Sequence, residues 1–251
     1  DIDSGMPQVK KDESLIFGEC LSSYLSKYCL MYPHRVKVIT PGMSYGSGLE
    51  LFQNTNPSDF IDVGIAEESA VIMATAMSAA NVIPIMFVYS TFLQRAYDEL
   101  IHDFARNNSH GIICVDRAGI VDGDGPTHQG IYDIAYLSTI PNLKILAPYN
   151  CEQAVKMLEY ALTNPSPYVI RYPKEAISKS FSNIIKESKW EIVKESENNK
   201  YIITYGPNLD KFLKILTNKK IGLINALWIK PYDKELLTNL LKNNVQLYFY
   251  E

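Results

Sequence analysis

Short apolar segments alternate with helix-forming segments along most of this chain. The apolar runs lie at residues 35–40, 60–63, 82–89, 111–115, 143–147 and 168–171. Strands that alternate with helices indicate a mostly parallel sheet covered on both faces, because each parallel connection must cross over the sheet. We therefore predict an α/β fold with a doubly wound, mostly parallel sheet.

A polar stretch rich in Lys, Ser, Glu and Asn divides the chain into two parts. We expect a linker at residues 1–13, a first α/β domain at 14–180 and a second linker at 181–200, with one strand near Trp190. A new alternation of strands and helices occupies residues 201–251. Its last expected strand ends at the end of the chain, which predicts a partial second α/β domain.

Composition excludes several classes of function. The 251 residues carry a net charge of -4, and 47% of them are hydrophobic. Without a basic excess we expect neither nucleic acid nor an anionic membrane as a partner, and no apolar run reaches the ~18 residues that span a bilayer. Cys20, Cys29, Cys114 and Cys151 are widely spaced and form no C-x-x-C pair, so we expect reduced thiols rather than a disulfide frame or a zinc site.

Residues 62–69 place a carboxylate between a strand and a helix. Gly64 allows a tight turn, and residues 66–80 are dominated by small, helix-forming side chains. Glu67 is therefore expected at the sheet edge where α/β folds bind ligands. The alternative is that Glu67 only stabilises the positive N-terminus of its helix.

Four segments in this order and spacing resemble the 1-deoxy-D-xylulose 5-phosphate synthase family, which belongs to the transketolase-like enzymes that use thiamine diphosphate. They are DVGIAE at 62–67, YSTFLQRAYD at 89–98, DRAGIVDGDGPTHQG at 116–130 and VIRYP at 169–173. The second and third segments are specific to the synthase within the group, whereas an Ala-Glu pair alone would be a weak signal. The resemblance covers about residues 12–251.

The resemblance implies a pyrimidine-binding domain followed by the start of a C-terminal domain. It implies that this chain lacks the family's N-terminal domain, which binds the cofactor diphosphate through Mg²⁺. The family reaction decarboxylates pyruvate and joins the remaining two carbons to D-glyceraldehyde 3-phosphate, the first step of non-mevalonate isoprenoid synthesis. We expect the fragment alone to be inactive, and the complete enzyme to be a homodimer in a plastid-type organelle or a bacterial cytoplasm.

The resemblance assigns cofactor contacts to four residues. Glu67 matches the carboxylic acid that hydrogen-bonds N1′ of the aminopyrimidine, a role that favours a buried carboxyl group. Phe92 matches the aromatic residue that stacks on the same ring. Ile65 and Met43 would line the apolar part of the pocket. The alternative is that Phe92, Ile65 and Met43 are ordinary core residues.

The resemblance assigns substrate contacts to five further residues. Tyr89, Arg117 and Arg171 match the group that binds the acceptor phosphate, and guanidinium groups suit phosphate because they pair with two of its oxygens. Asp124 and His128 match the pair beside the reacting carbons, where a histidine can move protons near neutral pH. The alternative is that Asp124 and His128 are satisfied by the loop backbone.

Two features depart from the family pattern or mislead. Residues 123–125, Gly-Asp-Gly, followed by Asn150 imitate a diphosphate-metal motif, but no second hard ligand follows Asn150, so we predict no metal site in this chain. Glu68 and Ser69 replace the usual Gln-His, and residues 43–48 differ from the usual Met-Arg-Glu-Gly-Ser-Gly. These differences put the charge around the cofactor pocket in doubt.

Two other classes of function remain open from the sequence. A transketolase or the β subunit of a 2-oxoacid dehydrogenase would share the fold and the catalytic Glu. A non-catalytic scaffold subunit would share the fold alone.

Overall fold

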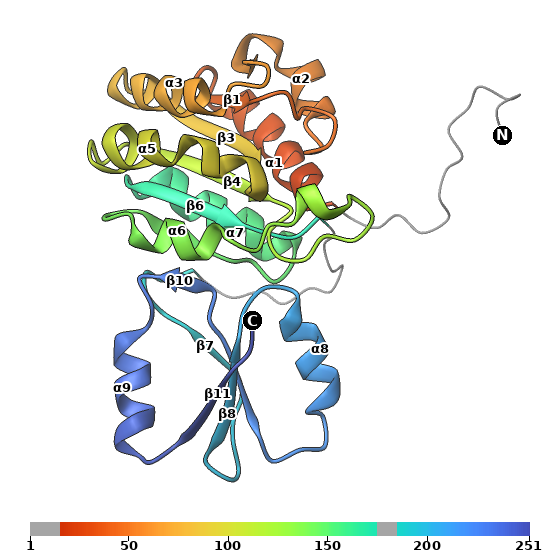
Figure 1. Cartoon of the computed structure of the whole chain (residues 1–251), viewed down its shortest axis with the longest axis vertical. Coiled ribbons are helices and arrows are strands. Elements are labelled where there is room, and N and C mark those ends of the chain that lie inside the picture. Colours follow the sequence, from red (N-terminus) through yellow and green to blue (C-terminus); the bar gives the residue numbers. More distant parts are fainter. Residues whose placement is uncertain (1–15, 175–184) are drawn as a thin grey trace, which may run out of the picture.

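The computed structural model describes residues 16–174 and 185–251, so the expected linker at 1–13 lies outside the described residues. Two α/β units are placed one above the other, the first above the second in Figure 1. Among the described residues, no helix combines the length and the apolar character needed to cross a bilayer.

The first unit is built on a sheet of seven strands. They are β1 (Val36–Thr40), β2 (Phe60–Asp62), β3 (Ile83–Tyr89), β4 (Gly111–Asp116), β5 (Lys144–Leu146), β6 (Pro167–Arg171) and β10 (Trp228–Lys230). Their order is β10-β5-β6-β4-β3-β1-β2, and every neighbouring pair is parallel except β10 and β5. The predicted mostly parallel sheet is confirmed.

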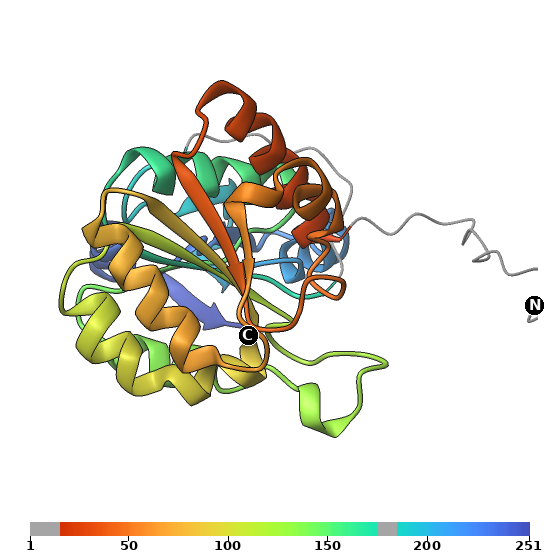
Figure 2. The same ribbon diagram turned by 90° about the horizontal axis from the view of Figure 1, so that it is seen from above.

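Helical segments cover both faces of this sheet, as the view from above in Figure 2 shows. One face packs against α1 (Phe17–Met31), α2 (Glu50–Thr55) and α7 (Cys151–Thr163). The other face packs against α3 (Glu67–Ala79), α6 (Asp133–Thr139) and the stretch between them in space, which comprises α4 (Ser90–Leu93), η2 (Gln94–Ala96), α5 (Tyr97–Glu99) and η3 (Leu100–Ala105). The sheet is therefore doubly wound.

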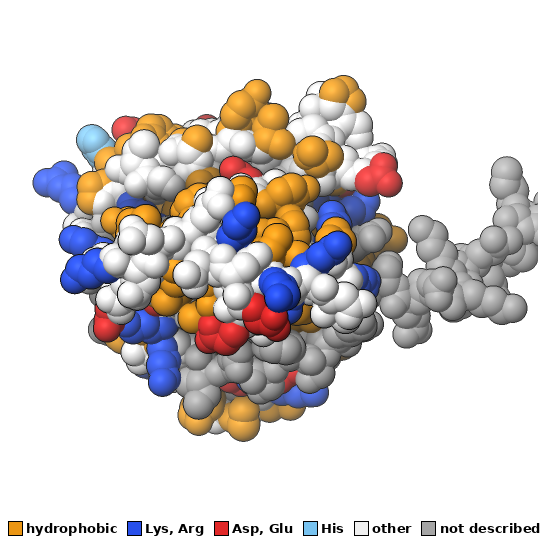
Figure 3. Space-filling model, turned by 90° about the horizontal axis from the view of Figure 1, so that it is seen from below, with side chains coloured by type: hydrophobic (Ala, Val, Ile, Leu, Met, Phe, Trp, Pro, Cys, Tyr) orange, Lys and Arg blue, Asp and Glu red, His pale blue; other side chains and the backbone are white. Residues whose placement is uncertain are grey.

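The second unit has a four-stranded sheet. Its strands are β7 (Glu191–Lys194), β8 (Lys200–Thr204), β9 (Gly222–Asn225) and β11 (Gln246–Phe249), in the order β11-β8-β9-β7, and its helices are α8 (Asn208–Ile215) and α9 (Lys234–Lys242). The strand expected near Trp190 is confirmed as β7, which runs antiparallel to β9. Seen from below, apolar, basic and acidic side chains are interspersed on this unit (Figure 3).

The two units share structure, which the sequence did not predict. β10 follows the second unit's β9 in the chain but pairs with β5 at the edge of the first sheet. The indole N–H of Trp190 donates to the carbonyl oxygen of Trp228 in β10 at 2.7 Å, which ties the segment before β7 to the same edge.

The prediction of four reduced thiols is wrong for two of them. Cys20 in α1 and Cys151 at the start of α7 form a disulfide, although 131 positions separate them in the sequence. Both helices pack on the same face of the sheet, so their Cα atoms come within 5.9 Å. Sequence spacing cannot reveal a pair that only the packing of two helices brings together. Cys29 and Cys114 are buried and free.

Candidate active site

Several predicted site residues follow the carboxyl ends of parallel strands, which meet at one edge of the sheet. Glu67 follows β2, Tyr89 ends β3, Arg117 follows β4 and Arg171 ends β6. The fold therefore explains how residues far apart in the sequence reach a common edge.

Glu67 begins α3 after a tight turn. Gly64 has a φ of 69°, which the left-handed region allows to glycine at little cost. The Asp62 carboxylate fixes the turn by accepting from the backbone N–H of Gly64 at 2.9 Å and of Gly42 at 2.8 Å. The turn delivers the Glu67 side chain into the protein, where only 1% of the residue is exposed.

The partner of the buried Glu67 carboxylate is Arg95. Its Nη1 lies 3.1 Å from Oε1 and 3.3 Å from Oε2 of Glu67. The expectation of a buried carboxyl is confirmed, but its surroundings are not purely apolar, because sequence reasoning missed this cation. The signal was available: Arg95 lies in the same motif as Phe92, three positions further on.

Phe92 lies at the centre of an aromatic cluster. The Tyr89 ring stacks against it with centroids 5.9 Å apart, and the His128 ring approaches edge-on at 5.4 Å. The guanidinium carbon of Arg95 lies over the Phe92 ring, 5.4 Å from its centroid. The structure therefore brings Glu67, Arg95, Phe92, Tyr89 and His128 into one continuous group.

Arg117 extends this group. Its guanidinium lies 3.9 Å from the centroid of the Tyr89 ring. It donates to Asp116 Oδ2 at 2.7 Å, to Asp124 Oδ2 at 3.0 Å and to the Gly46 carbonyl oxygen at 2.9 Å. Asp124 also accepts from Lys174 Nζ at 2.7 Å. Two cations thus face two carboxylates here, so this cluster carries no net charge when all four groups are ionised.

Burial and charge shift the pKa values in this cluster in opposite directions. Burial raises the pKa of Asp116 to about 7, although the Arg117 cation beside it acts against that shift. The hydrogen bond from Lys174, joined by that from Arg117, lowers the pKa of the more exposed Asp124. Burial raises the pKa of the Tyr89 hydroxyl, again opposed by Arg117.

A glycine makes room for this arrangement. A Cβ atom at Gly46 would lie 1.8 Å from the Tyr89 hydroxyl oxygen and 3.0 Å from the adjacent ring carbon. Gly46 also supplies the carbonyl oxygen that Arg117 contacts. The loop at 43–48, one of the departures from the family pattern, therefore contacts both of these residues.

Asp124 and His128 occupy the predicted glycine-rich loop. Nδ1 of His128 lies 2.9 Å from the Thr127 hydroxyl oxygen, and Gln129 braces the loop by donating to the carbonyl oxygens of Val121 and Gly125. No hydrogen bond joins Asp124 to His128 among the described residues. Asp124 bonds to Arg117 and Lys174, whereas the His128 ring packs in the aromatic cluster.

Arg171 has different neighbours from those expected. It pairs in register with Val115, and its guanidinium forms a buried ion pair with Asp133 of α6, at 2.8 Å and 3.2 Å. It also lies 5.5 Å from the centroid of the Tyr205 ring in the second unit. Among the described residues, no contact joins Arg171 to Arg117 or Tyr89.

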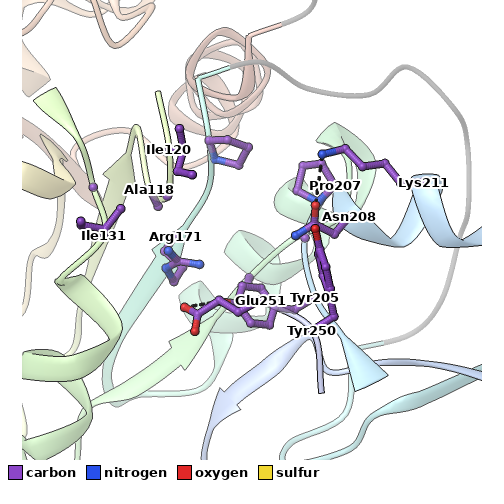
Figure 4. A pocket seen from close by; sticks show the side chains of 15 residues that line it. Ala118, Ile120, Ile131, Arg171, Tyr205, Pro207, Asn208, Lys211, Tyr250 and Glu251 are labelled. Carbon is purple, nitrogen blue, oxygen red and sulfur yellow. Dashed lines mark hydrogen bonds between the residues drawn. The ribbon is translucent and has the colours of Figure 1, made fainter. Parts of the chain in front are cut away.

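Arg171 lines a pocket of about 500 Å³ between the two units. Figure 4 shows its side chain between Ala118 of the first unit and Tyr205 of the second, whose hydroxyl donates to Glu251 at 2.8 Å. The predicted phosphate-binding residues are therefore divided: Tyr89 and Arg117 lie together, and Arg171 lies at this pocket.

The residues predicted to line the cofactor pocket differ in burial. Met43 is half-buried, and its sulfur accepts from the backbone N–H of Tyr89 at 3.3 Å. Ile65 is 84% exposed. Two other large side chains on the neighbouring loops are similarly exposed, Tyr45 at 80% and Ile120 at 88%. Apolar side chains this exposed around one edge mark a surface that another element can cover.

The described residues fit the pyrimidine part of thiamine diphosphate. The Glu67 carboxylate already accepts from a planar, nitrogen-rich group, and that group lies over the Phe92 ring. An aminopyrimidine is also planar, and its ring nitrogen N1′ would pair with the same carboxyl group, as the acceptor of the proton that Glu67 shares with it. Asn150, which follows the Gly-Asp-Gly triplet in the sequence, caps α7: its side-chain oxygen accepts from the backbone N–H of Gln153. The Asn150 amide therefore has a structural role in the helix.

Comparison with known proteins gives concordant results. The family model for the transketolase pyrimidine binding domain matches residues 16–179. The chain is 41% identical over 235 residues to a 1-deoxy-D-xylulose-5-phosphate synthase of Clostridium tetani, a match that covers 91% of this chain and 37% of that protein. It is 36% identical over 240 residues to the synthase of Thermotoga maritima, covering 93% of this chain and 39% of that protein. The chain thus spans well under half the length of these relatives.

Solved structures show the same fold at lower identity. A protein described as a split gene transketolase, inactive beta4 tetramer, matches with a TM-score of 0.82 and 21% identity, over 94% of this chain and 78% of that chain. Transketolase from Leishmania mexicana matches with a TM-score of 0.78 and 16% identity, over 94% of this chain and 38% of that chain. The predicted α/β fold of the thiamine-diphosphate-binding type is confirmed.

Proposed function

Because the chain belongs to the transketolase pyrimidine-binding domain family, we propose that it is the pyrimidine-binding part of a 1-deoxy-D-xylulose 5-phosphate synthase. The observation that supports this most is the buried Glu67, which Arg95 links to Phe92 at the carboxyl edge of the sheet. The chain is also 41% identical over 235 residues to such a synthase. The complete enzyme would decarboxylate pyruvate and transfer the remaining two carbons to D-glyceraldehyde 3-phosphate.

In this proposal Glu67 and Phe92 hold the pyrimidine ring of thiamine diphosphate. When bound, the cofactor supplies a carbon nucleophile that stores the electrons released by decarboxylation. Glu67 holds a proton at N1′ of the pyrimidine, and its burial suits that role because water is excluded from the contact. Phe92 orients the ring by stacking, with Met43 beside it.

The acceptor phosphate would bind near Arg117 and Tyr89. The Arg117 guanidinium is positioned by Asp116 and lies on the Tyr89 ring, so little side-chain entropy is lost when an anion binds. Arg171 reaches the phosphate in this proposal only if it turns from Asp133. His128 and Asp124 would move or hold protons at the acceptor carbonyl.

The exposed apolar side chains support the proposal that the complete enzyme contains a further domain or a second subunit. Ile65, Tyr45 and Ile120 would be covered by a diphosphate-binding domain, which holds Mg²⁺, or by the second subunit of a homodimer. The complete enzyme is proposed to act in a plastid-type organelle or a bacterial cytoplasm.

A transketolase activity is the second candidate, because transketolases are among the solved structures that share this fold. An assay of this chain together with its diphosphate-binding domain separates the two. One mixture offers pyruvate as donor and D-glyceraldehyde 3-phosphate as acceptor, and the other offers xylulose 5-phosphate as donor and ribose 5-phosphate as acceptor, so that each reaction gives a product different from its substrates. The proposal predicts turnover with pyruvate. Turnover with xylulose 5-phosphate alone would contradict it.

A non-catalytic scaffold is the third candidate. Glu67→Ala in the same complete protein should abolish turnover. The scaffold would be favoured if turnover is unchanged in this variant, or if the unmodified protein shows no turnover. The 251 residues alone should be inactive and should bind thiamine diphosphate weakly. Tight, metal-dependent binding to them in calorimetry would contradict that expectation.

A further inference from the structure

Arg95 is the residue that contacts both groups assigned to the pyrimidine ring. Its Nη1 lies within 3.3 Å of both Glu67 oxygens, and its guanidinium carbon lies 5.4 Å from the Phe92 centroid. A guanidinium is planar, stacks on aromatic rings and donates hydrogen bonds from nitrogen. An aminopyrimidine ring bound at this site would use the same two partners as Arg95, because it would stack on Phe92 and hydrogen-bond to Glu67.

We propose that Arg95 occupies the place of the pyrimidine ring while the cofactor is absent, and that it is displaced when the cofactor binds. The inference rests on the proposed function, because it takes Glu67 and Phe92 as the pyrimidine contacts. It adds an autoinhibitory contact to that site: cofactor binding must first break the Arg95–Glu67 ion pair.

The neighbours of Phe92 differ in how easily they can leave. Tyr89 is 9% exposed, its backbone N–H is bonded to Met43 and its ring supports Arg117. Arg95 has 49% of its side chain exposed, and Glu67 is its one ion-pair partner among the described residues. A half-exposed arginine can turn into solvent and keep its charge hydrated, so Arg95 is the replaceable neighbour.

The contact also explains why Glu67 can be buried before any cofactor arrives. A buried carboxylate without a partner is costly, and the cost is removed by a cation or by protonation. Arg95 supplies the cation in the free protein. When Arg95 leaves, the Glu67 carboxyl group is available to hydrogen-bond N1′ of the cofactor instead.

The test is calorimetric titration of thiamine diphosphate, with Mg²⁺ present, into this chain combined with its diphosphate-binding domain. Arg95→Met removes the charge and the donors but keeps a long side chain. It should tighten binding by about threefold to tenfold, the scale of a half-exposed ion pair with one buried partner. Arg95→Lys should shift the dissociation constant in the same direction by a smaller factor.

Arg106→Met is the matched control. Arg106 follows η3, is exposed, and has no side-chain partner among the described residues, so its replacement should leave the dissociation constant within about twofold. Weaker or unchanged binding in both Arg95 variants, with normal binding in the unmodified protein, would overturn the inference and leave the proposed function intact. No binding in the unmodified protein would overturn both.

A second measurement does not depend on the cofactor. In the 251-residue chain alone, Arg95→Met should lower the midpoint of thermal unfolding relative to Arg106→Met, because it leaves the buried Glu67 without its cation. Equal midpoints for the two variants at neutral pH would contradict the inference.

Discussion

Replacing Gly46 with alanine tests whether the loop at 43–48 positions Tyr89. The new Cβ would lie 1.8 Å from the Tyr89 hydroxyl oxygen, whereas ordinary contacts of this kind lie at 3.4–4 Å. The tyrosine or the loop must therefore move by about 1.6 Å. Tyr89 has little freedom to do so, because its ring stacks on Phe92 and supports the Arg117 guanidinium.

The size of the effect follows from two opposing contributions. Overpacking a well-packed site costs about 1–3 kcal/mol. Alanine also restricts the unfolded chain, which returns about 0.4–1 kcal/mol where the backbone is not strained, and Gly46 is not among the residues with positive φ. We expect a net loss of about 1–2 kcal/mol, which corresponds to a lowering of Tm by roughly 2–8 °C for a chain of this size.

Thermal unfolding of the 251-residue chain measures this loss. Tyr89→Phe removes the hydroxyl oxygen that the new Cβ would meet, so the double variant should recover a large part of the stability lost in Gly46→Ala. Tyr89→Phe alone is the control, because it removes the hydroxyl oxygen without adding the Cβ atom. A Gly46→Ala protein as stable as the parent, or no coupling with Tyr89→Phe, would refute the steric argument.

Three further perturbations follow from buried contacts. Arg171→Ala should destabilise the chain by about 3–5 kcal/mol, because it leaves the buried Asp133 carboxylate without its cation. Urea unfolding measures the loss of stability, and a loss below about 1 kcal/mol would contradict this prediction. Reduction of the Cys20–Cys151 disulfide should cost about 2–4 kcal/mol, and Cys151→Ser should remove the response to reductant. The pKa of Asp116 is raised by burial from 3.8 to about 7, so the folded protein binds this proton more tightly than the unfolded chain does. The contribution of Asp116 to stability should therefore be fully present below pH about 4 and be lost as the pH rises through about 7. The difference in unfolding free energy between Asp116→Asn and the unmodified protein, measured across this range, should change with pH, and a constant difference would contradict the reasoning.

Local patterns sufficed for most of the first unit. The apolar run before Gly64 and the small residues after it predicted β2, the turn and α3, because strand, turn and helix each depend on neighbours in the sequence. The parallel sheet followed from the alternation of strands and helices, since parallel strands need such crossovers.

Contacts between distant segments could not be predicted from local pattern. β10 joins the first sheet through pairing with β5, which lies more than 80 positions earlier, and Cys20 meets Cys151 through the packing of two helices. The partners of the site residues fall in the same class. Motifs identified Glu67, Arg117 and Arg171, but the ion pairs of Glu67 with Arg95 and of Arg171 with Asp133 depend on how neighbouring helices lie on the sheet.

In the proposed function, the Glu67 carboxyl group acts on the pyrimidine ring of thiamine diphosphate. The most direct measurement is the rate at which the C2 proton of the bound cofactor exchanges with deuterium, followed by NMR after acid quench, in this chain combined with its diphosphate-binding domain. Glu67→Gln should slow the exchange by about 10²–10⁴-fold while cofactor remains bound at saturating concentration, the usual size of an acid–base contribution. An exchange rate equal to that of the unmodified protein would contradict the claim.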